Sequence, residues 1–241
     1  MTLGAIGASF LLVYKLKSQS LPPVTHPFVA HSIESHFATA GDKGPVIRNV
    51  RTYARKKDGS WADVETLESP AGEVGDQETF VDVNSGRQVT LEPFSKSAMT
   101  EILTPRHIIR RVRLCPPGIN SPTLEHGWIL GYDVVKVTTQ YSVSKGRKET
   151  IEAWMAPTLG CYSLRRSEVG SNGPHNEFEA TDVIEGDPPS SMFEVPADYV
   201  ERSPSELSAE WEARFGKEFW PNSNLIKILD QRYYSLRSKQ H

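Results

Sequence analysis

Two cysteines are the residues of this 241-residue chain whose type most clearly allows a covalent link. Cys115 and Cys161 lie far apart, and neither has a second cysteine or a close histidine at the spacing that metal sites use. In an oxidising compartment the two thiols would pair, and closing a loop of that length would stabilise the fold by roughly 3–4 kcal/mol. Two unrelated buried thiols are the alternative. We expect the disulfide.

A basic cluster is the second group with chemical potential. It holds four arginines within eight residues, namely Arg106, Arg110, Arg111 and Arg113. Such a cluster could contact a phosphate or an anionic lipid headgroup, at about 1 kcal/mol per basic residue near a charged membrane. A solvated face balanced by neighbouring acidic residues is the alternative. No aromatic residue interrupts the cluster, which argues against a base-stacking surface.

Motifs for catalysis, cofactor binding or metal binding are missing from the sequence. The seven histidines do not fall at metal-ligand spacings, and the chain has neither the G-x-S-x-G elbow of hydrolases nor a phosphate-binding loop. Cys161 as a nucleophile, and the pairs Glu149/Glu152 and Glu177/Glu179 as catalytic carboxylates, are weaker alternatives to a disulfide and to solvated strand faces. We therefore predict no catalytic, cofactor-binding or metal-binding residue, and no cofactor.

The overall composition excludes several classes of protein. Lys and Arg number 27 against 30 Asp and Glu, which gives a net charge of −3. A dedicated nucleic-acid binder would carry a basic excess, so we expect no nucleic-acid partner. A hydrophobic share of 38% with 17 glycines and 17 prolines also excludes a disordered chain and a multi-span membrane protein.

The N-terminal residues 1–14 carry no charged side chain, and Lys15 and Lys17 follow them. This stretch is shorter than the about 20 apolar residues that cross a membrane, and a secretory signal has its basic residues before the apolar run. A signal or anchor, an interfacial anchor and a buried element all remain open. We favour a protein of the periplasm or cell envelope, with a membrane tether through residues 3–14, over a cytoplasmic one.

Alternating apolar and polar residues, interrupted by turn residues, dominate from about residue 27 onward. The turns contain Asp58-Gly59 and Gly86, which favour tight hairpins. A short helix is expected at 95–103, and 127–144 is expected as one central strand with Val135, Val137, Thr139 and Tyr141 inward. The other expected strands are 46–55, 61–67, 78–83, 88–91, 149–155, 162–169 and 178–185, and 107–114 is expected as a further strand or extended segment. About eight to ten strands at this spacing indicate a curved sheet, a barrel or a sandwich.

The end of the chain changes to helical periodicity. Ser203-Pro204-Ser205-Glu206 carries helix-start residues, and Leu207, Trp211 and Phe215 follow at helical spacing. A second short helix is expected near 225–233. The fold class is therefore mainly β (α+β): a large curved antiparallel sheet or half-barrel with a few short helices, including a C-terminal helical pair. The expected parts are a signal-like segment at 1–20, the β domain at 25–203 and a helical appendage at 204–241.

Residues 125–203 resemble a family of uncharacterised acidobacterial proteins. The resemblance is carried by residues 127–131, by 154–161, and by 186–189 together with 193–199. That family is distantly similar in strand pattern to the LolA/RseB-like periplasmic proteins, which implies a half-barrel that holds lipid or acyl chains in an apolar concavity. No motif transfers a ligand site residue by residue, so the implied function is an analogy of fold.

These observations favour a non-enzymatic exported or membrane-tethered protein that binds a lipid or acyl ligand, or an envelope protein partner. Two alternatives remain open: a structural or interaction module without a ligand, and a hydrolase whose site is assembled from residues distant in sequence.

Overall fold

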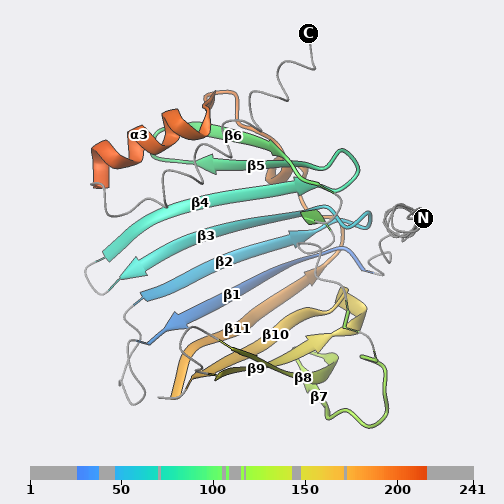
Figure 1. The fold of residues 1–241 in the computed structure, drawn as a ribbon. Coiled ribbons are helices and arrows are strands. Elements are labelled where there is room, and N and C mark those ends of the chain that lie inside the picture. The colour runs from blue at the N-terminus through green and yellow to red at the C-terminus, as the bar shows by residue number, and fades with distance from the viewer. Residues whose placement is uncertain are drawn as a thin grey trace, which may run out of the picture.

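A single twelve-stranded sheet contains most of the residues that this computed structural model describes. The described residues are 26–37, 47–69, 72–104, 107–108, 115–116, 118–142, 148–170 and 173–215. The chain forms two antiparallel meanders, and the first strand of one pairs with the last strand of the other (Figure 1). The expected mainly β, mostly antiparallel fold is confirmed, with more strands than the sequence indicated.

The first meander contains six strands: β1 (Phe28–His36), β2 (Ile47–Arg55), β3 (Trp61–Ser69), β4 (Gly72–Asp82), β5 (Arg87–Glu92) and β6 (Ser97–Ile102). The second contains five: β7 (His126–Ile129), β8 (Tyr132–Ser142), β9 (Lys148–Ala156), β10 (Tyr162–Gly170) and β11 (Gly173–Glu185). Pairing of β1 with β11 joins them, and the short β12 (Val200–Glu201) lies parallel to β6. The order across the sheet is β12-β6-β5-β4-β3-β2-β1-β11-β10-β9-β8-β7.

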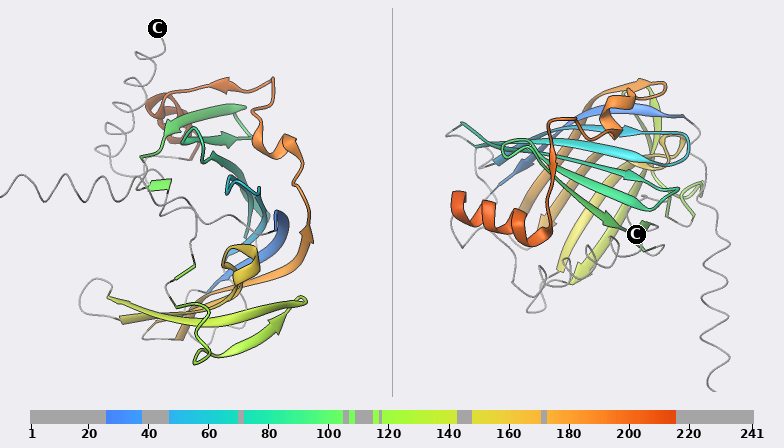
Figure 2. Two further views of the ribbon diagram at one scale, coloured as in Figure 1. Left: turned by 90° about the vertical axis from the view of Figure 1, so that its right-hand side faces the viewer. Right: turned by 90° about the horizontal axis from the view of Figure 1, so that it is seen from above.

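The sheet curves strongly, so that it has a concave and a convex face (Figure 2). The main core lies on the concave face, where Leu103 and Ile108, which follow β6, pack against residues of β1, β2 and β10. A second core covers the other face of β3–β5, beneath the segment 192–199 that includes part of the 3-10 helix η3 (Ser190–Phe193). Because successive strand residues point to opposite faces, Tyr53 belongs to the first core and Ala54 to the second.

Turn chemistry confirms the predicted hairpins. Asp58 accepts a hydrogen bond from the Ser60 amide at 2.8 Å, and Gly59 adopts a φ of 92°. Gly86 has a φ of 72°, and a Cβ there would lie 3.3 Å from the Leu103 carbonyl oxygen. Glycine at position 86 therefore allows both the β4–β5 turn and the close passage of the chain that leaves β6.

The helix expected at 95–103 is wrong, because these residues form a turn followed by β6. Residues 97–102 pair along their length with β5, and Ser97 and Ala98 are both buried. Backbone pairing at this end of the sheet outweighs the weak helical preference of a short segment.

The single central strand expected at 127–144 is also wrong. The chain reverses at Leu130-Gly131 to form the β7–β8 hairpin at the edge of the sheet. Val134 and Val135 are both fully buried on opposite faces, whereas Val137 is half-buried and Thr139 is exposed. The predicted burial is therefore correct for Val135, where both faces of β8 are covered, and is lost toward Thr139. Residues 143–144 lie outside the described residues.

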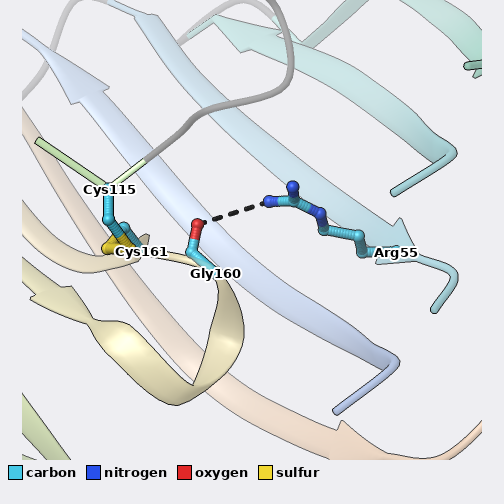
Figure 3. The surroundings of a disulfide bond; sticks show 4 residues. All are labelled: Arg55, Cys115, Gly160 and Cys161. Carbon is cyan, nitrogen blue, oxygen red and sulfur yellow. Dashed lines mark hydrogen bonds between the residues drawn. A yellow bond between two sulfur atoms is a disulfide. The ribbon is translucent and has the colours of Figure 1, made fainter. Parts of the chain in front are cut away.

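The predicted disulfide is confirmed: Cys115 and Cys161 are bonded, with their Cα atoms 5.0 Å apart and 46 positions apart in sequence (Figure 3). It joins the connection between β6 and β7 to the turn after the 3-10 helix η2 (Pro157–Leu159). Ile119, Val135 and Cys161 form a third small core around it. Disulfides persist in oxidising compartments, which agrees with an exported protein.

Helix α3 (Pro204–Phe215) begins with a reciprocal cap. The Ser203 amide donates to the Glu206 carboxylate at 2.7 Å, and the Glu206 amide donates to the Ser203 hydroxyl at 3.3 Å. Leu207 is buried, whereas the Trp211 and Phe215 side chains, the helix expected near 225–233 and residues 1–20 lie outside what the structure describes. Within the described part of the chain, no helix is both long and apolar enough to cross a membrane.

Removing the disulfide is expected to cost about 4 kcal/mol of unfolding free energy, because the reduced denatured chain regains the freedom of the closed loop. Urea unfolding of the Cys115→Ala/Cys161→Ala variant, beside the oxidised parent, measures this loss. If the variant unfolds at the same urea concentration as the parent, and reduction of the parent does not lower its midpoint, the disulfide does not stabilise the fold.

The two valines of β8 should differ in their contribution to stability. Val134→Ala is expected to cost about 2 kcal/mol, because it leaves a cavity in the main core, and Val137→Ala less than about 1 kcal/mol. Denaturant unfolding of both variants tests the position of β8. Equal losses would mean that β8 is covered along its whole length.

Candidate functional site

The concave face of β1–β3 and β10 carries a cluster of buried aromatic rings. The Phe28 and Tyr162 centroids lie 5.3 Å apart, and those of Tyr53 and Tyr162 lie 4.9 Å apart. Trp61 stacks on Tyr53 at 6.2 Å. The strand register brings these rings together, because Arg55 of β2 pairs with Phe28 on one side and with Trp61 on the other. One end of the concave face is therefore aromatic.

The other end of the same face carries a buried network of charges. Glu34 of β1 binds the guanidinium groups of Arg51 and Arg166, and Arg51 also binds Asp63. Glu34 is almost fully buried, and the other three members of the network, Arg51, Arg166 and Asp63, are largely so. Burial opposes the charge of Arg51, but hydrogen bonding to Asp63 and the charges of nearby carboxylates outweigh it and raise its pKa above the ordinary arginine value.

Arg55 lies at the aromatic end and is only 2% exposed. Its Nη1 donates to the Gly160 carbonyl oxygen at 3.4 Å, next to the disulfide (Figure 3). Arg51 has two carboxylate partners, whereas no carboxylate among the described residues forms an ion pair with Arg55. A buried guanidinium normally has a carboxylate or several carbonyl acceptors, since burying an unpaired charge is costly.

Four buried polar atoms of this region have no hydrogen-bond partner among the described residues: Ser32 Oγ, Asn49 Oδ1, Arg55 Nε and Trp61 Nε1. Their residues all belong to β1–β3 and, by the register of these strands, share the concave face. Most buried polar atoms in proteins have a hydrogen-bond partner, so four such atoms without one on a single face are unusual and can be considered together. The group combines two donors with acceptors and offers hydrogen bonds to a bound polar molecule.

The residues that the sequence singled out fall into three groups. Cys161 is held in the disulfide, so its role as a nucleophile is excluded. Glu152 and Glu179 make ion pairs with Lys136 and Arg165, as solvated strand faces do. Arg106, Arg110, Arg111 and Arg113 lie outside the described residues, and their proposed contact with an anionic surface stays a prediction.

The histidines are separated in the structure. His31 contacts the Thr52 hydroxyl at 3.1 Å and His36 the Asn176 side chain at 2.7 Å, while His26 lies beside Glu185. Across the described parts of the chain, no three residues of metal-binding type come together.

Sequence analysis missed the concave-face residues of β2. These are Asn49, Arg51, Tyr53 and Arg55, at every second position of the strand. Alternating arginines in a strand indicate a solvent face, and here they point to the interior of the curve. The available signal was the interleaved Tyr53, whose ring is unusual on a purely solvated face.

Comparison with known proteins finds similarity at the level of fold. No protein-family model matches the chain, and no curated protein matches its sequence. Among solved structures it is similar to MucB in the complex of Pseudomonas aeruginosa MucA and MucB, at 14% identity and a TM-score of 0.42, over 81% of this chain and 64% of that one. A DUF1329 family protein from Desulfovibrio piger has 10% identity and a TM-score of 0.31, over 80% and 98% of the two chains.

The chain thus spans less than two thirds of the length of MucB. MucB is an RseB homologue with a LolA-like fold, so the expected distant similarity to LolA/RseB-like proteins is confirmed. It concerns the arrangement of strands and carries no argument about ligand or partner. The resemblance of residues 125–203 to the acidobacterial family stays a prediction.

The charge network should tolerate loss of its central carboxylate poorly. Glu34→Gln is expected to destabilise the fold by about 3 kcal/mol, because Arg51 and Arg166 keep their buried charges and lose their shared partner. Thermal or urea unfolding measures the loss. Glu179→Gln, which removes an exposed partner of Arg165, serves as the control and should change stability by less than about 1 kcal/mol.

Proposed function

We propose that this chain is a non-enzymatic binding protein of the cell envelope that holds an acyl ligand with an anionic headgroup on the concave face of its sheet. The observation that supports it most directly is Arg55, a buried guanidinium beside aromatic rings that makes one long hydrogen bond and no ion pair within the described part of the chain.

The anionic part of the ligand follows from the cost of burying Arg55. A guanidinium presents five N–H donors, and here Nη1 has a carbonyl acceptor while Nε has none among the described residues. A carboxylate or phosphate accepts from Nε and a terminal nitrogen together, which would supply both charge and geometry. Trp61 Nε1, on the neighbouring strand of the same face, is a further donor.

The apolar part of the ligand follows from what surrounds Arg55. Its two cross-strand neighbours are Phe28 and Trp61, and Tyr53 and Tyr162 continue the aromatic surface. Small inorganic anions gain nothing from such a lining, whereas an acyl chain gains roughly 25 cal/mol for each Å² of apolar surface that it buries. An acyl carboxylate or an acyl phospholipid therefore fits the site better than a free anion.

The compartment follows from the disulfide. Bonded cysteines are typical of the periplasm and of the cell surface, and they are rare in the cytosol. An envelope compartment also supplies lipids and acylated molecules as ligands. An envelope protein as the occupant of the concave face is the second candidate, since the polar atoms of Ser32 and Asn49 could pair with a polypeptide backbone.

Titration with a fluorescent fatty acid such as cis-parinaric acid tests the proposal. The parent protein is expected to bind it saturably, and Arg55→Met to bind it at least about tenfold more weakly, because the charge-assisted hydrogen bonds of the guanidinium to the carboxylate are lost. The methyl ester of the same probe should bind both proteins alike. Arg165→Met, which removes an exposed arginine of β10, should leave fatty-acid binding unchanged.

The same variant separates loss of binding from loss of folding. Arg55→Met is expected to raise the free energy of unfolding by about 1–4 kcal/mol, because an apolar side chain of similar length replaces a buried charge that no described carboxylate pairs with. A more stable protein that binds less would identify Arg55 as a ligand-binding residue. Absence of saturable binding to the parent, or equal binding to both proteins, would remove the acyl-ligand function.

A further inference from the structure

The β7–β8 hairpin displays apolar side chains to solvent. Trp128 is 76% exposed, the highest value among the large apolar residues that the structure describes, and Leu130 is 44% exposed. Trp128 pairs with Asp133, and His126 pairs with Val135. The Trp128 side chain therefore lies on the face of the hairpin opposite Val134 and the concave core. A tryptophan this exposed buries little of its apolar surface in the core, and tryptophan is enriched among the residues that dominate protein interfaces.

Leu130 is a second feature that folding does not explain. It has a φ of 51° and precedes Gly131 with a φ of 81°, so both central residues of the turn are left-handed. Asparagine or glycine suits the first of these positions, and a larger side chain is disfavoured there. The hairpin therefore keeps an apolar side chain at its tip at some expense of stability.

No described strand pairs with the outer side of β7, which we call the open edge of β7. Strand β7 is the last strand of the sheet, and among the described strands it pairs only with β8. The Lys136 amide donates to the Glu125 carbonyl oxygen at 2.9 Å, so Glu125 and Lys136 form a hydrogen-bonded pair, and every second residue pair of the β7–β8 ladder does the same. Gly127 and Ile129 consequently face β8, whereas the amide and carbonyl groups of His126 and Trp128 point outward. This edge has neither the proline nor the lysine that commonly blocks an exposed strand.

Carboxylates surround the hairpin. Glu125, Asp133 and Glu185 are each about half exposed. Burial, followed by the hydrogen bond to Glu185 and the charges of Glu185 and Asp182, raises the pKa of Tyr132 to about 12. Among the described residues of this corner, Lys136 is held between Glu125 and Glu152. The field of the described residues is therefore acidic and favours a cationic partner.

We propose that the β7–β8 hairpin docks an extended, basic segment of a partner polypeptide, which adds as a further strand to the open edge of β7 and packs an apolar side chain on Trp128. Strand addition gives affinity through backbone hydrogen bonds, and the side chains of the edge give specificity.

The charges favour this occupant over the two others that an apolar edge could attract. A second copy of the chain would bring two acidic rims together, which is repulsive. An anionic membrane surface would be repelled by the same carboxylates, although a tryptophan and a leucine at a hairpin tip would suit its interface. A basic polypeptide can form hydrogen bonds with the edge of β7, pack an apolar side chain on Trp128 and pair its cations with the surrounding carboxylates.

Fluorescence anisotropy with a labelled, end-blocked peptide that alternates Val or Thr with Lys or Arg tests the proposal. The parent protein is expected to bind this peptide, and Trp128→Ala to bind it at least about tenfold more weakly, the loss typical of an interface hot spot. A peptide with Glu in place of Lys and Arg, and one N-methylated on its pairing face, should not bind. Raising the salt concentration should weaken binding of the basic peptide.

Phe94→Ala is the matched control, because Phe94 is also an exposed aromatic residue but lies beyond β5 at the opposite end of the sheet. It should bind the peptide as the parent does. Equal binding of the acidic and basic peptides, unchanged binding by Trp128→Ala, or no binding by the parent overturns the proposal. Trp128-dependent sedimentation with phosphatidylcholine–phosphatidylglycerol vesicles, or Trp128-dependent dimerisation in analytical ultracentrifugation, in place of peptide binding, also overturns it.

Discussion

Pairing between β1 and β11 is the constraint on which the rest of the structure depends. These strands come from opposite ends of the sheet-forming sequence, and their pairing turns two separate meanders into one curved sheet. It also leaves β6 and β7, which are consecutive in sequence, near opposite ends of the sheet. The chain between them must span that distance, and the Cys115–Cys161 disulfide fixes its far end to the turn before β10.

Curvature gives the residues of β2 two different environments. On the convex side, Ala54 packs beneath the segment after β11, as in an ordinary sheet core. On the concave side the same strand carries Arg51, whose charge is balanced by Glu34 and Asp63, and Arg55, whose charge no described carboxylate balances. A sheet selected only for stability would place apolar residues at both positions. The contrast between the two arginines is what separates a structural network from a candidate binding group.

The parts of the fold that sequence analysis predicted are local. Asp58-Gly59 and Gly86 determine hairpins through the backbone conformation of a few residues, and Ser203 with Glu206 determines the start of α3. The missed parts depend on distant partners: residues 97–102 become a strand because β5 is available to pair. The candidate site was missed for the same reason, since only the curvature of the whole sheet shows that the arginine-bearing face of β2 is the inner one.

The concave site and the hairpin are built on one corner of the molecule. The Gly160 carbonyl that receives Arg55 directly precedes Cys161, and the disulfide packs against Val135 of β8, which pairs with His126 of β7. The disulfide thus fixes the turn that positions the buried guanidinium to the connection between β6 and β7, and its apolar surroundings include Val135 of the strand that supports Trp128. Hydrogen bonds of a sheet edge fray easily, whereas a disulfide surrounded by apolar side chains does not. Bracing at this corner therefore stabilises the end of the sheet that carries both the buried Arg55 side chain and the β7–β8 hairpin.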